Sequence, residues 1–193
     1  RPWRLDLPPS LRWVDVDFPK MLEYKTGLLR NETPRCRYES FAADLSDEAA
    51  RPALLARITE GASRVLVVSE GLLIYLNASQ VSSLASDLAA VPAARCWVID
   101  LASPRLLAWM NRSWSKQVTK GDARFQFAPA EGTAFFSQYG WTEERFVSSM
   151  DASRRLKREM GGAWFWRLVM KLYPARVREQ FRRMSGFALL DRA

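Results

Sequence analysis

The chain has 193 residues, a formal net charge of +8, two cysteines and no histidine. Its length fits one domain, and 48% hydrophobic with 26% charged residues is typical of a chain that folds around a core. The lack of histidine excludes serine–histidine triads, cysteine–histidine pairs and histidine-ligated metals. Two cysteines are too few for a disulfide framework or a four-cysteine zinc site. We therefore expect reduced thiols, no metal site, no secretory signal and a cytoplasmic location.

Nearly all of the net positive charge lies in residues 151–184. This segment holds ten basic and three acidic residues, a net charge of +7. Such a segment fits a nucleic acid, an anionic lipid or an acidic substrate, or simply a solvated helix face. Its apolar part, residues 164–173, is interrupted by Arg167 and Lys171 and is too short to span a bilayer.

Strand and helix signals alternate through the first part of the chain. Strands are expected at 11–16, 37–42, 64–70 and 94–99, and helices at 19–30, 48–60, 78–90 and 104–114. Pro19 suits the first turn of a helix, and Asn77 with Gln80 forms a capping-box pair. The run at 64–70 is typical of a strand buried on both faces. The alternation predicts an α/β fold with a parallel sheet and helices on both faces.

The pattern changes after residue 121. A short helix is expected at 133–139, two helical stretches rich in arginine and aromatic residues at 152–172 and 174–184, and a closing strand at 186–191. We interpret residues 1–193 as a single domain, with residues 151–184 as a basic helical insertion before the last strand.

Acidic residues stand at or just after the ends of four successive predicted strands: Asp17, Asp44, Glu70 and Asp100. Ligands of such sheets bind beyond the carboxyl ends of the strands. The four acids therefore indicate a site that needs negative charge or acceptors for hydroxyl groups. Capping of the following helices is the alternative interpretation. Asp15 lies inside its strand and is less well placed.

Three stretches at these strand ends resemble motifs of the leucine carboxyl methyltransferase family. Residues 14–19 read VDVDFP, with Lys25 shortly after, residues 42–47 read AADLSD, and residues 69–76 read SEGLLIYL. The closing stretch 184–192, MSGFALLDR, is similar to the end of the bacterial members. The resemblance covers nearly the whole chain and points to the bacterial branch of S-adenosylmethionine-dependent methyltransferases.

The resemblance implies a Rossmann-like class I methyltransferase sheet with a late antiparallel strand, and S-adenosyl-L-methionine as the cofactor. It implies that Asp17 binds the ribose hydroxyls and that Asp44 faces the adenine amino group, with Leu45 packed on the ring. Glu70 is then expected near the methionine end of the cofactor, and Tyr75 near the acceptor. The family's glycine-rich loop precedes the part that this chain matches. The first strand and the N-terminal helices are therefore expected to be missing, as in a fragment or a truncated relative.

The resemblance also makes the basic segment a lid over the acceptor site. Arginine pairs with carboxylates in a bidentate way, so an anionic substrate is expected to bind there. The candidate residues are Arg154, Arg155, Arg158 and Arg167. A carboxylate is ionised near neutral pH and needs no general base, which agrees with a chain that lacks histidine.

These inferences predict O-methylation of a small-molecule or peptide carboxylate, or of another small acidic acceptor, with no nucleic-acid partner. The alternative is a non-catalytic methyltransferase-like domain whose basic helices bind anionic lipid or RNA. A weak peripheral contact with membranes is compatible with either interpretation.

Overall fold

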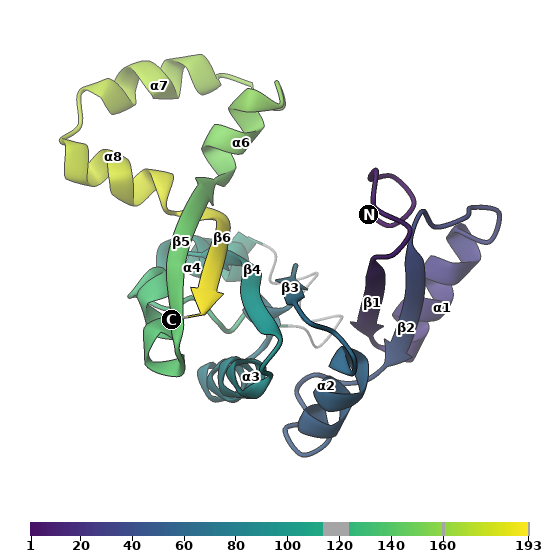
Figure 1. Cartoon of the computed structure of the whole chain (residues 1–193). Helices are drawn as coiled ribbons and strands as arrows, with labels where there is room; N and C mark the ends of the chain where they lie inside the picture. The colour runs from purple at the N-terminus through teal and green to yellow at the C-terminus, as the bar shows by residue number, and fades with distance from the viewer. Residues whose placement is uncertain (114–123, 160, 193) are drawn as a thin grey trace. The chain divides into compact units, whose positions relative to one another are not determined.

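The computed structural model describes residues 1–113, 124–159 and 161–192, without the side chains of residues 163, 164, 166 and 167. The chain divides into two compact units, Arg1–Ile58 and Thr59–Ala193. The strands form two separate sheets, a two-stranded sheet β1-β2 in the first unit and a four-stranded sheet β3-β4-β6-β5 in the second (Figure 1).

The first unit is built on a parallel strand pair, β1 (Arg12–Asp17) and β2 (Arg37–Ala42), joined through α1 (Pro19–Leu28). Both strands and the helix that opens at Pro19 confirm the sequence prediction. The next helix, α2 (Arg51–Thr59), starts later than expected. The reason is a turn in which Asp47 Oδ1 accepts hydrogen bonds from the backbone N–H groups that follow it.

The second unit has a mixed sheet. β3 (Val65–Ser69) and β4 (Ala94–Ala102) are parallel, whereas β6 (Ser185–Arg192) lies between β4 and β5 (Trp141–Ser148) and is antiparallel to both. The predicted α/β class and the late antiparallel strand are therefore confirmed. β5 was not predicted. Its central residues are charged, and its register shifts between Glu143 and Arg145, which breaks the alternation that marks a strand.

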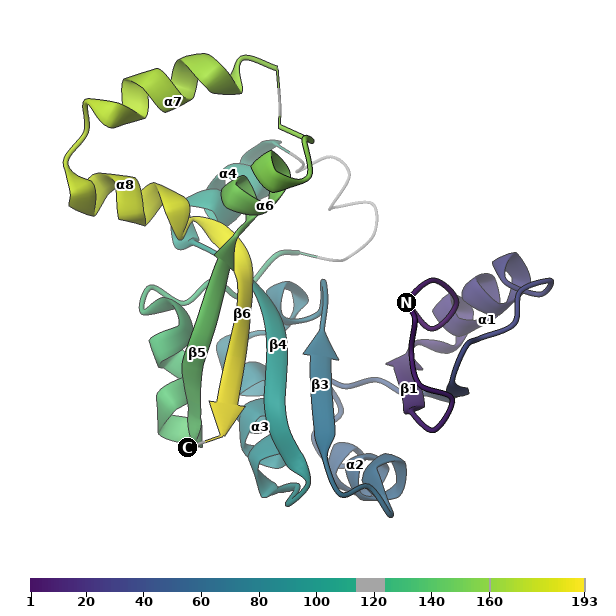
Figure 2. The ribbon, with the colours of Figure 1, turned by 45° about the horizontal axis from the view of Figure 1, so that its top comes forward.

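α3 (Ala78–Ala90) and the 3-10 helix η2 (Gly132–Tyr139) contribute buried side chains to the core of the second unit. The predicted capping box of α3 is present, because Asn77 and Gln80 each accept a backbone hydrogen bond from the other. Four apolar side chains of α3 are buried, namely Val81, Leu84, Ala85 and Leu88. Figure 2 shows α3 alongside the sheet.

Two tryptophans occupy the centre of this core. Trp97 is fully buried, with its ring edge-on to Phe136 at 5.3 Å and to Trp141 at 5.6 Å between centroids. Each indole also has an acceptor, Ser69 Oγ for Trp97 at 2.9 Å and the Ala85 carbonyl for Trp141 at 3.0 Å. The core of the unit therefore holds large rings without leaving a buried indole N–H unpaired.

β3 is not buried on both faces as predicted. Leu66 and Val68 are 59% and 37% exposed, while Ser69 is buried. The run of β-branched residues predicted the strand itself correctly, but it carries no information on whether a second layer covers the outer face. In addition, β4 continues to Ala102, so Asp100 lies inside the strand and not just after it.

The predicted single helix over 152–172 is wrong, because two helices occupy this stretch. α6 (Ser149–Arg155) ends before Lys157, whose φ is 54°, and α7 (Ala163–Lys171) begins after Gly162, whose φ is 80°. Left-handed backbone of this kind cannot continue a helix. With α8 (Ala175–Arg182) these helices lie beyond the ends of β5 and β6 (Figure 2).

α4 (Pro104–Ser113) agrees with the predicted helix at 104–114, whose last residue lies outside the described part. Among the described residues, no helix is both long enough and apolar enough to cross a membrane.

Gly186→Ala is expected to destabilise the second unit by about 1–3 kcal/mol, the usual cost of overpacking. A Cβ at Gly186 would lie 2.6 Å from the Val147 carbonyl oxygen and against the Phe146 ring, so β5 and β6 would have to separate. Chemical denaturation measures the change. Gly27→Ala is the control, because a Cβ in that helix meets nothing and should stabilise by about 0.5–1 kcal/mol. Equal effects of the two substitutions would contradict the close approach at Gly186.

Candidate functional site

The carboxyl edge of the first unit carries two exposed acids. Asp17 is the last residue of β1, and Asp44 follows the end of β2 by two residues. The parallel register pairs Asp17 with Ala42, and the Ala43 N–H donates to the Asp17 carbonyl at 3.1 Å. The two carboxylates therefore share one edge of the strand pair, as the sequence predicted.

The loop after β2 has a fixed local structure. Asp44 Oδ1 accepts from the Ser46 N–H at 2.8 Å and from its hydroxyl at 2.7 Å. Arg51, only 1% exposed, donates to the Leu45 carbonyl at 2.8 Å. Asp44 therefore stabilises a turn, whereas the alternative interpretation expected it to cap the following helix, α2, which begins only at Arg51. The turn uses Oδ1 of Asp44, and a carboxylate can accept hydrogen bonds through its second oxygen as well.

Asp15 is part of a different arrangement. It accepts hydrogen bonds from Trp13 Nε1 and the Tyr38 hydroxyl, each at 2.8 Å, and it pairs with Lys25. Burial alone would raise the pKa of Asp15, but these donors outweigh burial and hold the pKa below its ordinary value. Asp15 therefore ties β1, β2 and α1 together, in agreement with its predicted poor placement for a ligand.

Glu70 and Asp100 lie together in the second unit. Glu70 directly follows β3, and the N–H of Gly71 donates to Asp100 Oδ1 at 3.1 Å. Gly71 has a φ of 62°, so the turn that presents this N–H favours glycine. Burial raises the pKa of Asp100 and the Glu70 charge adds to this, while the Gly71 N–H partly opposes it. Asp100 therefore holds a proton more readily than an ordinary aspartate.

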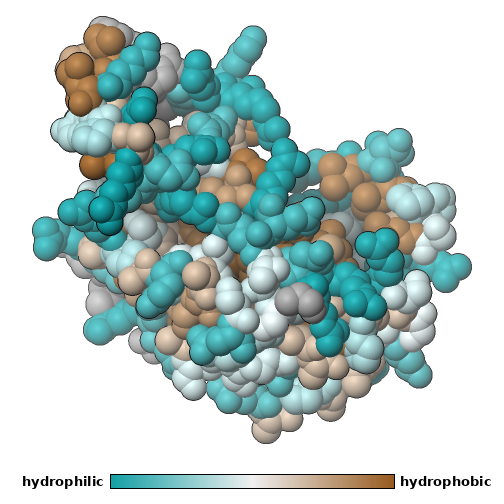
Figure 3. Space-filling model, turned by 60° about the vertical axis from the view of Figure 1, so that its left-hand side comes forward, coloured by the Kyte–Doolittle hydropathy of each residue, from teal (hydrophilic) through white to brown (hydrophobic). Residues whose placement is uncertain are grey.

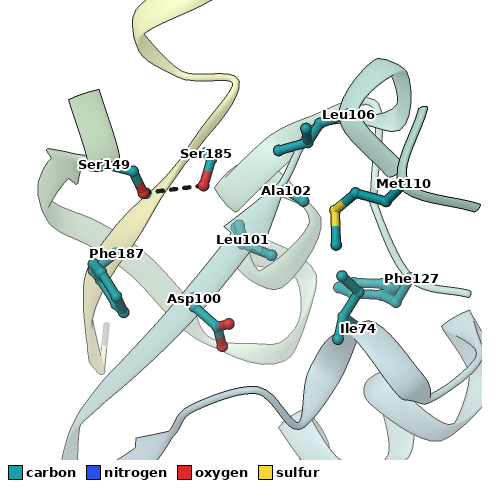
Figure 4. A pocket seen from close by; sticks show the side chains of 11 residues that line it. Ile74, Asp100, Leu101, Ala102, Leu106, Met110, Phe127, Ser149, Ser185 and Phe187 are labelled. Atoms are coloured by element: carbon teal, nitrogen blue, oxygen red, sulfur yellow. Dashed lines mark hydrogen bonds between the residues drawn. The ribbon is translucent and has the colours of Figure 1, made fainter. Parts of the chain in front are cut away.

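Asp100 lines a pocket of about 170 Å³ within the second unit (Figure 4). Most of its walls are apolar, and the described lining residues are Ile74, Asp100, Leu101, Ala102, Leu106, Met110, Phe127, Ser149, Ser185, Gly186 and Phe187. The polar side chains among them are one carboxyl group and two hydroxyls. The pocket therefore suits a small, largely apolar group with one polar atom.

The two hydroxyl groups of the pocket lie where the segment that holds α6, α7 and α8 joins the sheet. Ser149 is the first residue of α6 and Ser185 is the first residue of β6. Their Oγ atoms lie 3.0 Å apart and share a hydrogen bond (Figure 4). The chain therefore leaves the sheet and returns to it through one wall of the pocket.

Tyr75 lies close to this pocket but outside its lining. It ends the short helix η1 (Leu73–Tyr75), and its ring packs on Phe125 with centroids 5.4 Å apart. The preceding residue, Ile74, lines the pocket. The role predicted for Tyr75 at the acceptor stays a prediction.

The four predicted substrate arginines are also outside the described lining of the pocket. Arg154 and Arg155 are exposed in the last turn of α6, and Arg158 is exposed just after it. Arg167 belongs to α7, and its side chain lies outside the described part of the chain. Their roles in substrate binding remain predictions.

Several pocket residues had no role in the sequence analysis. Asp100 was recognised only as an acid near a strand end. Ser149 and Ser185 went unnoticed, although they flank the basic segment on both sides. The apolar members come from η1, β4, α4 and the residues around Phe127, which only the fold brings together.

Asp100→Asn and Asp15→Asn are expected to alter the pH dependence of stability in opposite senses. The raised pKa of Asp100 means that its ionised form opposes folding. The asparagine variant should therefore gain stability at neutral pH and lose that advantage towards the unfolded-state pKa of about 3.9. Asp15, with its lowered pKa, stabilises the fold above that value, so its asparagine variant should be less stable at neutral pH. Denaturant titrations at several pH values from acid to neutral measure the free energy of unfolding and test both expectations. If that free energy changes with pH in the same way for wild type and for Asp100→Asn, the expectation for Asp100 is wrong.

Residues 1–89 match the sequence model of the family described as leucine carboxyl methyltransferase. A Mycolicibacterium smegmatis protein, provisionally named as an S-adenosyl-L-methionine-dependent methyltransferase, is 30% identical over 152 residues, 74% of this chain and 50% of that protein. A solved duf574 family protein from Streptomyces avermitilis has a TM-score of 0.57 at 16% identity, covering 96% of this chain and 66% of that one. A Thermobifida fusca protein, provisionally described as a methyltransferase, has a TM-score of 0.57 at 14% identity, covering 94% and 63%.

The chain spans about half the length of the curated relatives it matches. At these low identities the solved structures show the fold alone, and it is the fold of class I methyltransferases. The family match covers three of the acids singled out at strand ends, Asp17, Asp44 and Glu70. The resemblance seen in the sequence is confirmed: residues 1–89 match the model of the leucine carboxyl methyltransferase family, and the similar curated proteins are bacterial and provisionally named as S-adenosyl-L-methionine-dependent methyltransferases.

Proposed function

We propose that the protein is an S-adenosyl-L-methionine-dependent methyltransferase that methylates a small acidic acceptor. The observation that carries the proposal is the pair Asp17 and Asp44. These residues are exposed together at the carboxyl edge of β1 and β2, within the part that matches the family model. The related Mycolicibacterium smegmatis protein is named for the same cofactor.

The residues present fit this cofactor chemically. Its ribose hydroxyls and adenine amino group are hydrogen-bond donors, and its sulfonium carries positive charge. Exposed carboxylates accept such bonds and favour positive charge. On this proposal Asp17 accepts from the ribose hydroxyls, Asp44 faces the adenine amino group with Leu45 on the ring, and Glu70 lies near the methionine end.

The protein's own contribution to methyl transfer is position and environment. When bound, the cofactor supplies a methyl group on a sulfonium, which an in-line displacement transfers. In the pocket, apolar side chains such as Ile74, Met110 and Phe127 would exclude water from a bound acceptor. The hydroxyls of Ser149 and Ser185 would orient its polar atom.

A carboxylate is the acceptor that we propose first. It is already ionised near neutral pH and needs no base, which suits a chain without histidine. Arg154 and Arg155 lie on α6, whose first residue lines the pocket, and arginine binds carboxylates in a bidentate way. These exposed arginines would draw an anionic acceptor towards the pocket.

A hydroxyl or amine acceptor is the second candidate, and one observation favours it. The ionisable group in the described lining of the pocket is an acid, Asp100, and no basic side chain accompanies it there. Its raised pKa would let Asp100 take a proton from an acceptor more readily than an ordinary aspartate.

Calorimetric titration with S-adenosyl-L-methionine and S-adenosylhomocysteine tests the cofactor. We expect binding to weaken about tenfold or more in Asp17→Ala and in Asp44→Ala, because a hydrogen bond to a charged group contributes roughly 1.5–3 kcal/mol. Asp6→Ala removes an exposed acid of the same unit and should bind as wild type does. Thermal melting confirms that each variant is folded.

The titration should use both this chain and the complete translated reading frame that contains it, since the similar curated proteins are longer than this chain. Binding by neither protein, or equal binding by Asp17→Ala, Asp44→Ala and wild type, would overturn the proposal.

The stability of the methylated product to base distinguishes the two acceptor classes. With methyl-labelled cofactor and a metabolite extract, a carboxyl methyl ester releases labelled methanol in alkali, whereas ethers and methylamines do not. We expect a base-labile product and a several-fold higher KM for Arg154→Glu/Arg155→Glu. Arg95→Glu, at the other end of β4 from the pocket, should leave KM unchanged. A base-stable product that Asp100→Asn abolishes would instead establish the second candidate.

A further inference from the structure

An apolar stripe faces solvent on α7. Phe165, Leu168 and Leu172 are 50%, 58% and 85% exposed. Phe165 and Leu168 lie in α7 and Leu172 directly follows its end, and the spacing of three and then four residues places them on one helix face. Tyr173, which precedes α8, and Phe181, which lies within α8, are 46% and 40% exposed. Isolated exposed apolar residues are ordinary, but such a row on one helix indicates a surface that is covered in use.

Exposed basic side chains are numerous along α6, α7 and α8. Two nearby acids, Asp151 and Glu179, are already paired with Arg182, at 2.7 and 3.4 Å. Seven further basic residues of this segment are exposed, namely Arg154, Arg155, Lys157, Arg158, Lys171, Arg176 and Arg178. Figure 3 shows hydrophobic atoms beside hydrophilic ones at the top of the molecule, where α7 lies in Figure 1.

Exposed apolar side chains together with basic ones favour one kind of binding partner over others. A second copy of the chain would bring two segments of net charge +7 face to face, which costs free energy. RNA would match the charge, but it is bound through aromatic stacking and polar contacts, not through exposed leucines such as Leu168 and Leu172. A lipid bilayer with anionic headgroups offers hydrocarbon for the leucines and negative charge for the basic residues.

We propose that the segment from α6 to α8 docks on anionic lipid surfaces. The stripe of Phe165, Leu168 and Leu172 enters the boundary between headgroups and acyl chains, and the basic residues contact the headgroups. α7 has nine residues, so it lies in the interface and does not span it.

The fold gives this surface a firm attachment to the sheet. At its start, Ser149 shares a hydrogen bond with Ser185 in the pocket wall. At its end, Arg183 pairs with Glu143 of β5 and lies over the Phe146 ring, 4.4 Å from its centroid. The segment that we propose to touch lipid is therefore attached directly to one wall of the pocket.

Vesicle flotation tests the proposal without any need for methyl transfer. The chain is mixed with vesicles of phosphatidylcholine alone or of phosphatidylcholine with phosphatidylglycerol. We expect flotation only with the anionic vesicles, and weaker binding at high salt. Phe165→Ser/Leu168→Ser/Leu172→Ser should bind about tenfold more weakly or worse, because each buried methylene contributes to membrane affinity. Reversal of Arg154, Arg155, Lys157 and Arg158 to Glu should abolish binding.

The control uses a second exposed apolar row with the same spacing. Met21, Tyr24 and Leu28 on α1 are 52%, 66% and 67% exposed but lie outside the basic segment. Met21→Ser/Tyr24→Ser/Leu28→Ser should float as wild type does, and circular dichroism confirms that all variants are folded. Equal loss in both serine variants, binding to neutral vesicles, or dimerisation or RNA binding in the absence of flotation would overturn the proposal.

Discussion

The position of β6 between β4 and β5 is the constraint on which the second unit depends. β6 runs antiparallel to both neighbours, so β5 and β6 form a pair whose connection is the whole segment from α6 to α8 and not a tight turn. The register sets Ser148 opposite Gly186, where the strands approach too closely for a Cβ. The same register brings Ser149 to Ser185 and closes one wall of the pocket.

Local patterns predicted most of the elements, and the failures have physical reasons. β1, β2, α1 and the capping box of α3 follow from short-range signals such as Pro19 and the pair Asn77 and Gln80. β5 was missed because charged residues at its centre and a register shift interrupt its alternation. The helix predicted over 152–172 ignored the glycines that precede α7, one of which adopts left-handed backbone.

The candidate site was predicted only where it follows strand ends directly. Asp17 and Asp44 were found because parallel strands bring their carboxyl ends to one edge. The pocket was not, because its lining comes from separate elements whose proximity depends on the antiparallel return of β6. A sequence of this kind therefore predicts which residues share a strand edge better than it predicts a pocket whose walls come from separate elements.

Two aspartates, one in each unit, show why a pattern of acids cannot by itself assign function. Asp15 and Asp100 both lie inside strands and are both partly buried. Three side-chain donors satisfy Asp15 and lower its pKa, so its charge serves the packing of β1, β2 and α1. The donors to Asp100 in the described part of the chain are backbone N–H groups, its pKa is raised, and its side chain lines the pocket. The donors around a carboxyl group, which only the fold supplies, separate an acid that holds the structure together from one that is available to a substrate.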